Sequence, residues 1–305
     1  MIAYLKLIRW PNLVFIALTL ILIKFSFFEE FGAAITLSTF GYALLMLATL
    51  CIAASGYVIN DIYDVQADKI NKPEKLIIGN KISEKKANNL FIILNVIGVG
   101  IGFYLANLLG KPGFVAIFIF SSALLYLYAS YLKQIPVLGN VLISLLVGFV
   151  VLLPSVFDLF PAINSQNKQV QSLLFSILLD YAIFAFLINL LREIVKDQED
   201  AKGDYNAGIQ TLPIILGHSR TNKIIFAIGI LPVAAIVYYI YNYLFENTFL
   251  VIYTLIFILA PLLYFQVKIW EAKKKKHFSH LSLLLKIIMF FGLTSIGLYQ
   301  FILVS

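Results

Sequence analysis

Half of the acidic residues of this chain fall in two short stretches that share one spacing. Of its 16 acidic residues, eight are Asp61, Asp64, Asp68, Glu193, Asp197, Glu199, Asp200 and Asp204. In each stretch three aspartates follow the pattern DxxDxxxD. On a helix, offsets of three and four place side chains on one face, so the spacing predicts two stripes of carboxylates.

Stripes of like charge point to a bound cation. Carboxylates at this spacing repel one another and destabilise a bare helix. Magnesium takes oxygen ligands from a few carboxylates and from substrate phosphates, whereas zinc prefers His and Cys, which both stretches lack. A single DxxD more often caps a helix end, but two matched clusters favour a metal site. We expect two Mg²⁺ ions, and the predicted metal ligands are Asn60, Asp61, Asp64, Asp68, Asp197, Asp200 and Asp204.

Basic residues adjoin both clusters. Arg192 and Lys196 lie one helical turn apart in the second, Lys72 and Lys75 follow the first, and Lys133 lies between two later apolar segments. Each of them alone is more often an anchor that sets membrane topology. Together, beside metal-binding carboxylates, they predict a site for a diphosphate, whose oxygens accept hydrogen bonds from Lys and Arg.

The elements that carry these clusters are apolar. The 305 residues are 61% hydrophobic and only 13% charged, which excludes an ordinary soluble globule. The sequence predicts an all-α, multi-pass bundle of nine transmembrane helices forming one domain over 1–305, with polar loops at about 60–88 and 192–223. The predicted spans are 10–28, 34–59, 89–109, 113–132, 137–157, 171–191, 224–244, 248–267 and 281–304.

The basic residues also predict an orientation. Of 23 Lys and Arg, only Lys24, Lys111 and Lys168 fall on the far side of this nine-helix arrangement, with Lys286 unassigned. Basic loops stay cytoplasmic, so we expect the N-terminus and both polar loops in the cytoplasm and the C-terminus opposite, in a cytoplasmic membrane. The net charge of +7 therefore reflects topology and not a nucleic-acid partner.

The residues from Asn60 to Asp68 resemble a known motif. They read NDIYDVQAD, which is similar to the NDxxDxxxD motif of the UbiA superfamily of intramembrane prenyltransferases. Asp200 and Asp204 resemble its second motif, DxxxD on the sixth helix. The chain departs from the family's NRPxRPLPSG segment at Lys72 and Lys75, which stand for arginines. The resemblance implies Mg²⁺-dependent transfer of a prenyl group from an isoprenyl diphosphate to a lipid-soluble acceptor.

The resemblance also assigns roles within the site. Asp64, Asp200 and Lys133 are expected to be catalytic, by promoting departure of the diphosphate. The RExxKDxxDxxGD pattern from Arg192 is most similar to the branch of digeranylgeranylglyceryl phosphate synthases, which favours geranylgeranylglyceryl phosphate as acceptor. The predicted acceptor contacts are Arg9, Asn12 and Asn140, and the predicted walls of the prenyl chamber are Tyr126, Tyr128 and Tyr131.

Two other functions remain open from the sequence. An aromatic quinone precursor, such as a hydroxybenzoate or dihydroxynaphthoate, could replace the glycerol-phosphate lipid as acceptor, since its carboxylate would also bind a cation. An ion-coupled transporter would use intramembrane acids as well, but transporter sites lie near the bilayer midplane on broken helices. The two clusters are instead predicted at one membrane face.

Overall fold

The computed structural model describes residues 1–298, apart from the side chain of Lys75. Within that range nine helices are long and apolar enough to cross a membrane, which confirms the predicted all-α bundle and makes the chain an integral membrane protein. The spanning elements are α2 (Trp10–Ile21), continued by a π-helical segment (Leu22–Phe28), α3 (Thr39–Tyr63), α5 (Glu84–Leu108), α6 (Val115–Ser130), α7 (Leu138–Pro154), α8 (Lys168–Asn206), α10 (His218–Tyr239), α11 (Thr248–Thr254) with α12 (Ala260–Glu271), and α13 (Lys275–Thr294).

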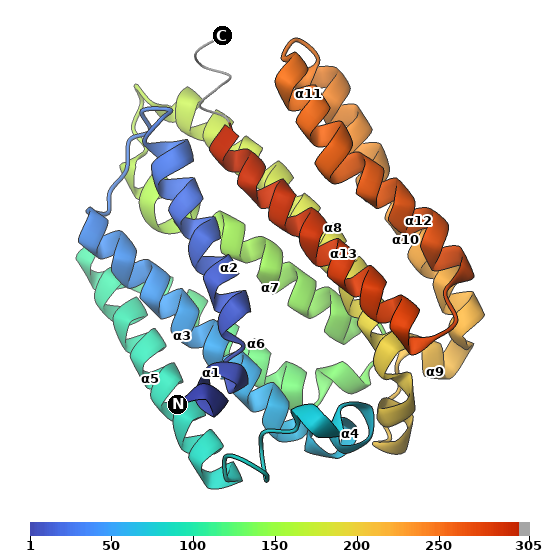
Figure 1. Cartoon of the computed structure of the whole chain (residues 1–305). Helices are drawn as coiled ribbons and strands as arrows, with labels where there is room; N and C mark the ends of the chain where they lie inside the picture. Colours follow the sequence, from blue (N-terminus) through green and yellow to red (C-terminus); the bar gives the residue numbers. More distant parts are fainter. Residues whose placement is uncertain (299–305) are drawn as a thin grey trace.

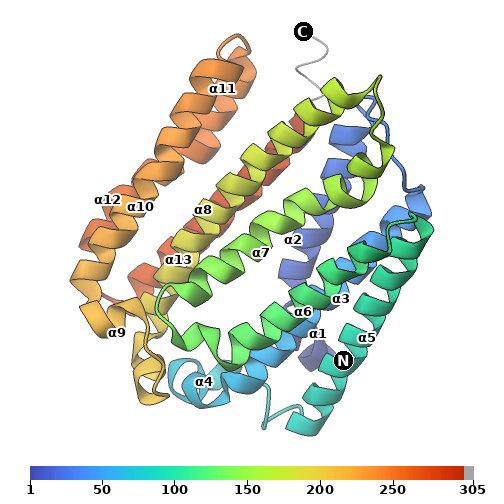
Figure 2. The same ribbon diagram turned by 180° about the vertical axis from the view of Figure 1, so that it is seen from behind.

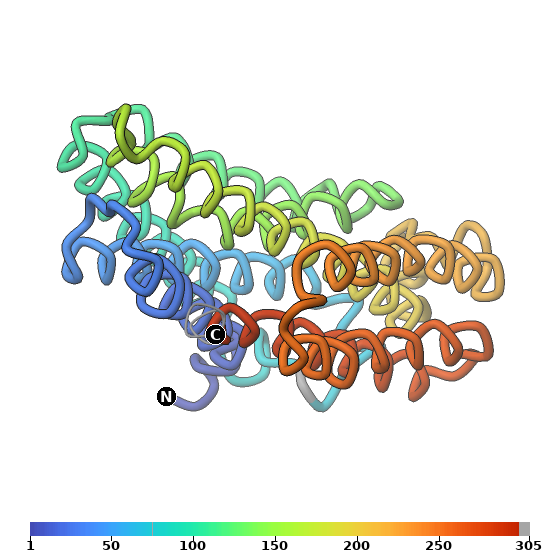
Figure 3. Tube along the Cα trace, turned by 90° about the horizontal axis from the view of Figure 1, so that it is seen from above, coloured from blue at the N-terminus to red at the C-terminus, as the bar shows by residue number. Residues whose placement is uncertain are grey.

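Three short helices lie outside these spans. They are α1 (Ile2–Leu7), α4 (Val65–Asn71) and α9 (Leu212–Leu216). Figures 1 and 2 show α4 and α9 at one end of the bundle and α11 at the other. Viewed from above, α10 to α13 gather on one side and the earlier spans on the other (Figure 3).

Helix α3 begins later than its apolar pattern suggests. The sequence predicts a span from position 34, whereas α3 starts at Thr39. The Ser38 side chain accepts a hydrogen bond from the Gly41 backbone N–H, 3.2 Å away, and such a cap satisfies a donor that has no partner within the helix. The cap therefore sets the first turn of the helix.

Helix α8 is much longer than predicted. The sequence predicts a span over 171–191 followed by a polar loop, but α8 runs for 39 residues from Lys168 to Asn206. No proline interrupts 192–206, and the helix ends where Gly208 adopts a positive φ of 74°. The first part of the predicted loop is thus a helical extension that carries the second aspartate cluster.

Among the described residues, the apolar core has three large clusters. One packs α8 against α10, α12 and α13 through residues such as Leu191 and Phe265. A second packs α3 against α5 and α6 through residues such as Leu45 and Phe118. A third joins the π-helical continuation of α2 to α7 and α8, through residues that include Phe27. These clusters hold the helices that enclose the cavity described below.

A buried ion pair fixes the end of the bundle away from α4. Lys24, at the far end of the first span, lies 2.7 Å from Asp158 beyond α7, and their side chains are 1% and 0% exposed. The other carboxylate oxygen of Asp158 accepts hydrogen bonds from the backbone N–H groups of Thr36 and Leu37, at 2.8 and 2.6 Å. Three segments distant in sequence are thereby joined.

Candidate active site

The two aspartate clusters meet where α4 lies against α8. The Asn71 side chain, at the end of α4, donates to the backbone oxygen of Asp200 at 2.8 Å and accepts from the Gly203 N–H at 2.9 Å. Lys72 extends the contact, with its ammonium 2.6 Å from the Asp200 carboxylate. The loop after the first cluster is therefore tied to the helix that carries the second.

This contact requires a glycine on α8. A Cβ at position 203 would lie only 2.3 to 2.5 Å from the side-chain amide atoms of Asn71. Carbon atoms in packed interiors do not approach so closely. Gly203 therefore allows α4 to approach α8 directly beside Asp200 and Asp204.

The first cluster forms the single stripe that its spacing predicts. Helices α3 and α4 are separated only by Asp64, whose N–H donates to Asn60 and whose carbonyl accepts from Asp68, at 2.9 and 2.8 Å. The backbone therefore continues almost as one helix. Asn60 also donates through its side chain to Asp64, at 2.5 Å. Lys133, from the connection between α6 and α7, donates to the other oxygen of that carboxylate.

The second cluster lies on the helical extension of α8 and uses a partner from α7. The side-chain amide of Asn140 donates to Asp197 at 2.7 Å. Arg192 and Lys196, predicted to bind diphosphate, both contact the carboxylate of Glu193, at 2.9 and 3.3 Å. Glu193 thus holds the two cations together at the inner edge of the cluster.

The electrostatics of α4 fit a bound cation. Burial and, after it, the nearby carboxylates of Asp64, Asp61 and Asp200 together raise the pKa of Asp68 to about 6, against the opposing charge of Lys72. Burial opposes protonation of Lys72, yet the Asp200 carboxylate raises its pKa overall. A raised carboxyl pKa among other carboxylates indicates an excess of negative charge.

The residues present suit magnesium in their chemistry. One oxygen of Asp200 is buried without a hydrogen-bond partner, an arrangement that is costly unless a ligand completes it. In the described part of the chain, no three His, Cys, Asp or Glu side chains are already grouped as a metal site. Asp61, Asp64 and Asp200 are paired instead with Arg9, Lys133 and Lys72. A bound metal ion would replace these basic side chains as the partner of the carboxylates.

A cavity of about 300 Å³ begins beside the clusters and runs into the bundle. Helices α2, α3, α6, α7, α8 and α13 form its walls. Its lining includes Asn60, Glu193 and Lys196 at the polar end, and beyond them it is mostly aliphatic and aromatic, including Phe118 and Phe149. We call this cavity the chamber. Its shape and polarity suit an amphiphile with a charged head and a long apolar chain.

The predicted tyrosines divide between the chamber and the surface. Tyr128 lines the chamber, whereas Tyr126 and Tyr131 are 42% and 61% exposed and are not among its lining residues. The placement predicted for the latter two is wrong. On a helix, residues two positions apart point to nearly opposite sides, so Tyr126 lies on the outer face of α6 when Tyr128 faces the chamber. Tyr131 lies just beyond α6, where its φ of −140° departs from the helical conformation.

The predicted acceptor contacts also separate. Arg9 and Asn12 line the chamber, with Arg9 held 2.7 Å from Asp61. Asn140 is instead bound to Asp197, as described above, and is absent from the chamber lining. The side chain of Lys75 lies outside the described part of the structure.

The sequence analysis does not identify several polar residues that line the chamber. They include Tyr57, Asn189 and Lys286. Asn189 could have been found, because it precedes Glu193 by four residues and so extends the polar stripe of α8 inward. Lys286 is a basic residue within a predicted span, and that position alone marks a functional candidate.

Comparisons with known proteins agree with this arrangement. The model of the UbiA prenyltransferase family matches residues 20–293. A digeranylgeranylglyceryl phosphate synthase from Korarchaeum cryptofilum (strain OPF8) is 33% identical over 264 residues, which cover 84% of this chain and 86% of the relative. The chain therefore belongs to the UbiA prenyltransferase family and is a membrane-embedded prenyltransferase.

Solved structures share the fold. A digeranylgeranylglyceryl phosphate synthase is 26% identical, with a TM-score of 0.62 and coverage of 98% of this chain and 97% of that one. A UbiA homolog from Archaeoglobus fulgidus, bound to GPP and Mg²⁺, is 19% identical with a TM-score of 0.56, covering 96% and 99% of the two chains. At 19% identity, the similarity to the Archaeoglobus homolog shows a shared fold only.

Proposed function

We propose that this protein transfers a geranylgeranyl group from its diphosphate to geranylgeranylglyceryl phosphate. The bond between C1 of the donor and the diphosphate oxygen breaks, and the acceptor hydroxyl oxygen bonds to C1 and loses its proton. The products are an ether lipid and diphosphate. The observation that carries the proposal is the chamber, whose polar end, lined by Asn60, Glu193 and Lys196, lies beside the two aspartate clusters and leads into an apolar interior.

The carboxylates supply the metal site in this proposal. Two Mg²⁺ ions would be held by Asn60, Asp61, Asp64, Asp68, Asp197, Asp200 and Asp204, as the clusters' spacing and the unpartnered oxygen of Asp200 suggest. Magnesium supplies Lewis acidity toward the leaving diphosphate. The structure of the Archaeoglobus homolog with GPP and Mg²⁺ supports this choice of metal.

The cations of the chain stabilise the leaving group. Lys133 is 10% exposed and is held against Asp64, so it carries a positive charge beside the first cluster. Lys72 does the same beside Asp200, and Arg192 and Lys196 line the chamber. Charges that are placed before the reaction stabilise negative charge as it develops, because they need not reorganise.

The chamber binds the apolar chain and limits water. Its aromatic lining includes Tyr57 and Tyr128, whose ring faces attract positive charge. Such rings suit an allylic carbon that becomes positive as the diphosphate departs. The apolar walls also reduce the access of water, which would otherwise capture that carbon in place of the acceptor.

The proposed site faces the cytoplasm. The polar loops carry many of the basic residues, and the short helices of these loops, α4 and α9, lie at one end of the bundle (Figure 1). Basic loops favour the cytoplasmic side. The N-terminus would lie on the same side. The whole chain acts as one catalytic domain in this proposal, because helices from the first span, α2, to the last, α13, contribute walls to the chamber.

The test is to identify the product. Purified protein is incubated with Mg²⁺, geranylgeranyl diphosphate and one acceptor at a time: geranylgeranylglyceryl phosphate, hydroxybenzoate or dihydroxynaphthoate. Mass analysis should find a diether phospholipid with the first acceptor. Prenylated aromatic acid without any diether would overturn the acceptor and leave the chain a prenyltransferase.

A further inference from the structure

Lys286 is a basic residue inside a membrane span with an uncharged partner. It is the twelfth residue of α13 (Lys275–Thr294), and its ammonium donates to the side-chain oxygen of Asn12 on α2 at 2.8 Å. No carboxylate within 4.0 Å is recorded for it among the described residues. A charge at such a position is costly, and in membrane proteins it usually marks a ligand site.

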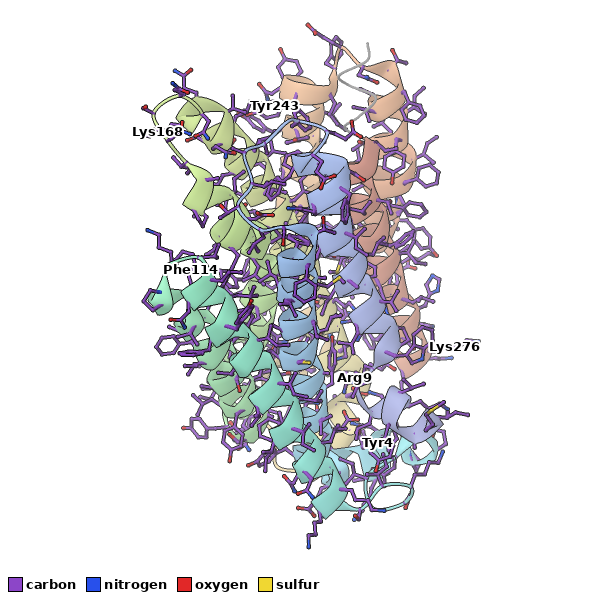
Figure 4. All side chains as sticks on the ribbon, turned by 90° about the vertical axis from the view of Figure 1, so that its left-hand side faces the viewer. Tyr4, Arg9, Phe114, Lys168, Tyr243 and Lys276 are labelled. Carbon is purple, nitrogen blue, oxygen red and sulfur yellow. The ribbon has the colours of Figure 1, made fainter. Side chains whose placement is uncertain are left out.

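The helices that hold Lys286 and Asn12 present the same gradient to the chamber. On α13 the lining residues are Lys286 and then Met289, Gly292 and Leu293. On α2 they are Arg9 and Asn12, followed by Phe15, Ile16 and Thr19. On both helices the charged and amide side chains lie nearer the end of the bundle that holds α4, and most of the lining residues beyond them are apolar. Figure 4 shows Arg9 toward the end marked by Tyr4, with Lys168 and Tyr243 at the other. Two helix faces with this change in polarity fit one ligand that has a polar head and an apolar chain.

The described lining of the chamber contains four basic residues, Arg9, Arg192, Lys196 and Lys286, and one acidic residue, Glu193. Arg9 pairs with Asp61 outside the lining, and Arg192 and Lys196 share Glu193, so Lys286 is left without a counter-charge among the described residues. In addition, the Nε of Arg192 is buried and has no hydrogen-bond partner. A buried donor without an acceptor is costly. An anion placed among Arg9, Arg192 and Lys286 would supply acceptors and balance the charge.

We propose that Lys286, with Arg9 and Arg192, binds the phosphate monoester of the acceptor lipid. This inference rests on the proposed function and deepens it. The cations paired with the aspartates, Lys72 and Lys133, follow α4 and α6 and would serve the donor diphosphate. Lys286 and Asn12 come from a different part of the wall, formed by α13 and α2. The donor diphosphate and the acceptor phosphate thus have separate sets of cations. The prenyl chains of both substrates extend into the apolar part of the chamber.

The experiment compares two acceptors in the full-length protein. One is geranylgeranylglyceryl phosphate, and the other is geranylgeranylglycerol, which lacks the phosphate. For Lys286→Met we expect KM for the phosphorylated acceptor to rise about tenfold or more, since a hydrogen bond to a charged group contributes that much. KM for the donor and for the acceptor without phosphate should change less than about threefold. Lys286→Arg should recover most of the loss.

The matched control is Lys268→Met on α12. Lys268 also lies on a spanning helix, but it packs over the ring of Tyr264 and is absent from the chamber lining. Its kinetics should equal those of the wild type. Equal losses for both acceptors in Lys286→Met, or an increase in donor KM alone, would overturn the inference. If the wild type makes no ether lipid from either acceptor, it is the proposed function that fails.

Discussion

The ammonium of Lys72 lies 2.6 Å from the carboxylate of Asp200, although the two residues are 128 positions apart in the chain. Lys72 follows the first aspartate cluster and Asp200 belongs to the second. The ion pair, with the hydrogen bonds of Asn71 beside it, holds the two clusters as one site. A substrate diphosphate and its metal ions would be bound between them.

Removal of one carboxylate from either cluster should abolish turnover. Asp64→Ala and Asp200→Ala are each expected to lower kcat at least about a hundredfold, because changes in groups that only orient metal ligands already cost about 10–100-fold. Glu246→Ala, an exposed residue far from the clusters, is the control. Initial rates at saturating Mg²⁺ measure the effect, and more than a tenth of wild-type rate in both variants would contradict the two-cluster site.

Gly203→Ala should separate the clusters without unfolding the protein. The added methyl group would overlap the Asn71 side chain and move α4 away from α8. Overpacking of this kind costs about 1–3 kcal/mol, while activity should fall about tenfold or more. Gly100→Ala, where a Cβ meets nothing within 4 Å, should keep full activity. Unchanged turnover in Gly203→Ala would show that close contact between α4 and α8 is dispensable.

The buried Lys24–Asp158 pair should matter for stability and not for chemistry. Lys24→Met leaves the Asp158 carboxylate buried with only its backbone partners, and breaking such a pair costs about 3–5 kcal/mol. Thermal unfolding in detergent should therefore shift clearly to lower temperature, whereas Lys168→Met, exposed at the same end of the bundle, should not shift it. If both variants unfold alike, the pair contributes little.

The orientation can be tested by labelling single cysteines in a Cys51→Ser background. Lys202→Cys lies on the extension of α8 beside the clusters, and Gln166→Cys lies before α8 at the other end. An impermeant thiol reagent should modify position 202 only from the cytoplasmic side and position 166 only from the opposite side. The reverse pattern would invert the proposed topology.

The sequence predicts those features that depend on local periodicity. The nine apolar spans and the single stripe of Asp61, Asp64 and Asp68 follow from residue spacing along helices, and the structure has both. The hydropathy pattern underestimates the length of α8, because it marks where the apolar residues stop and not where the helix ends. Residue roles at the site remain predictions.

Pairings between distant segments could not be predicted in the same way. Asn140 was expected beside the acceptor, yet its amide reaches Asp197 on α8. That contact depends on how α7 packs against α8, where a Cβ at Gly148 would lie 2.8 Å from the Ala182 backbone oxygen. The partner of Lys286 likewise depends on packing, because its ammonium reaches Asn12 only where α13 lies beside α2. Such contacts follow from helix packing, which single-sequence patterns do not specify.

The central claim is that the aspartate clusters and the chamber perform one Mg²⁺-dependent prenyl transfer. The most direct measurement follows diphosphate release from geranylgeranyl diphosphate by purified protein, with Mg²⁺ and acceptor each present or omitted. We predict release only when both are present, with one diphosphate for each ether lipid formed. Solute movement across vesicles without any release of diphosphate would contradict the claim and favour a transporter.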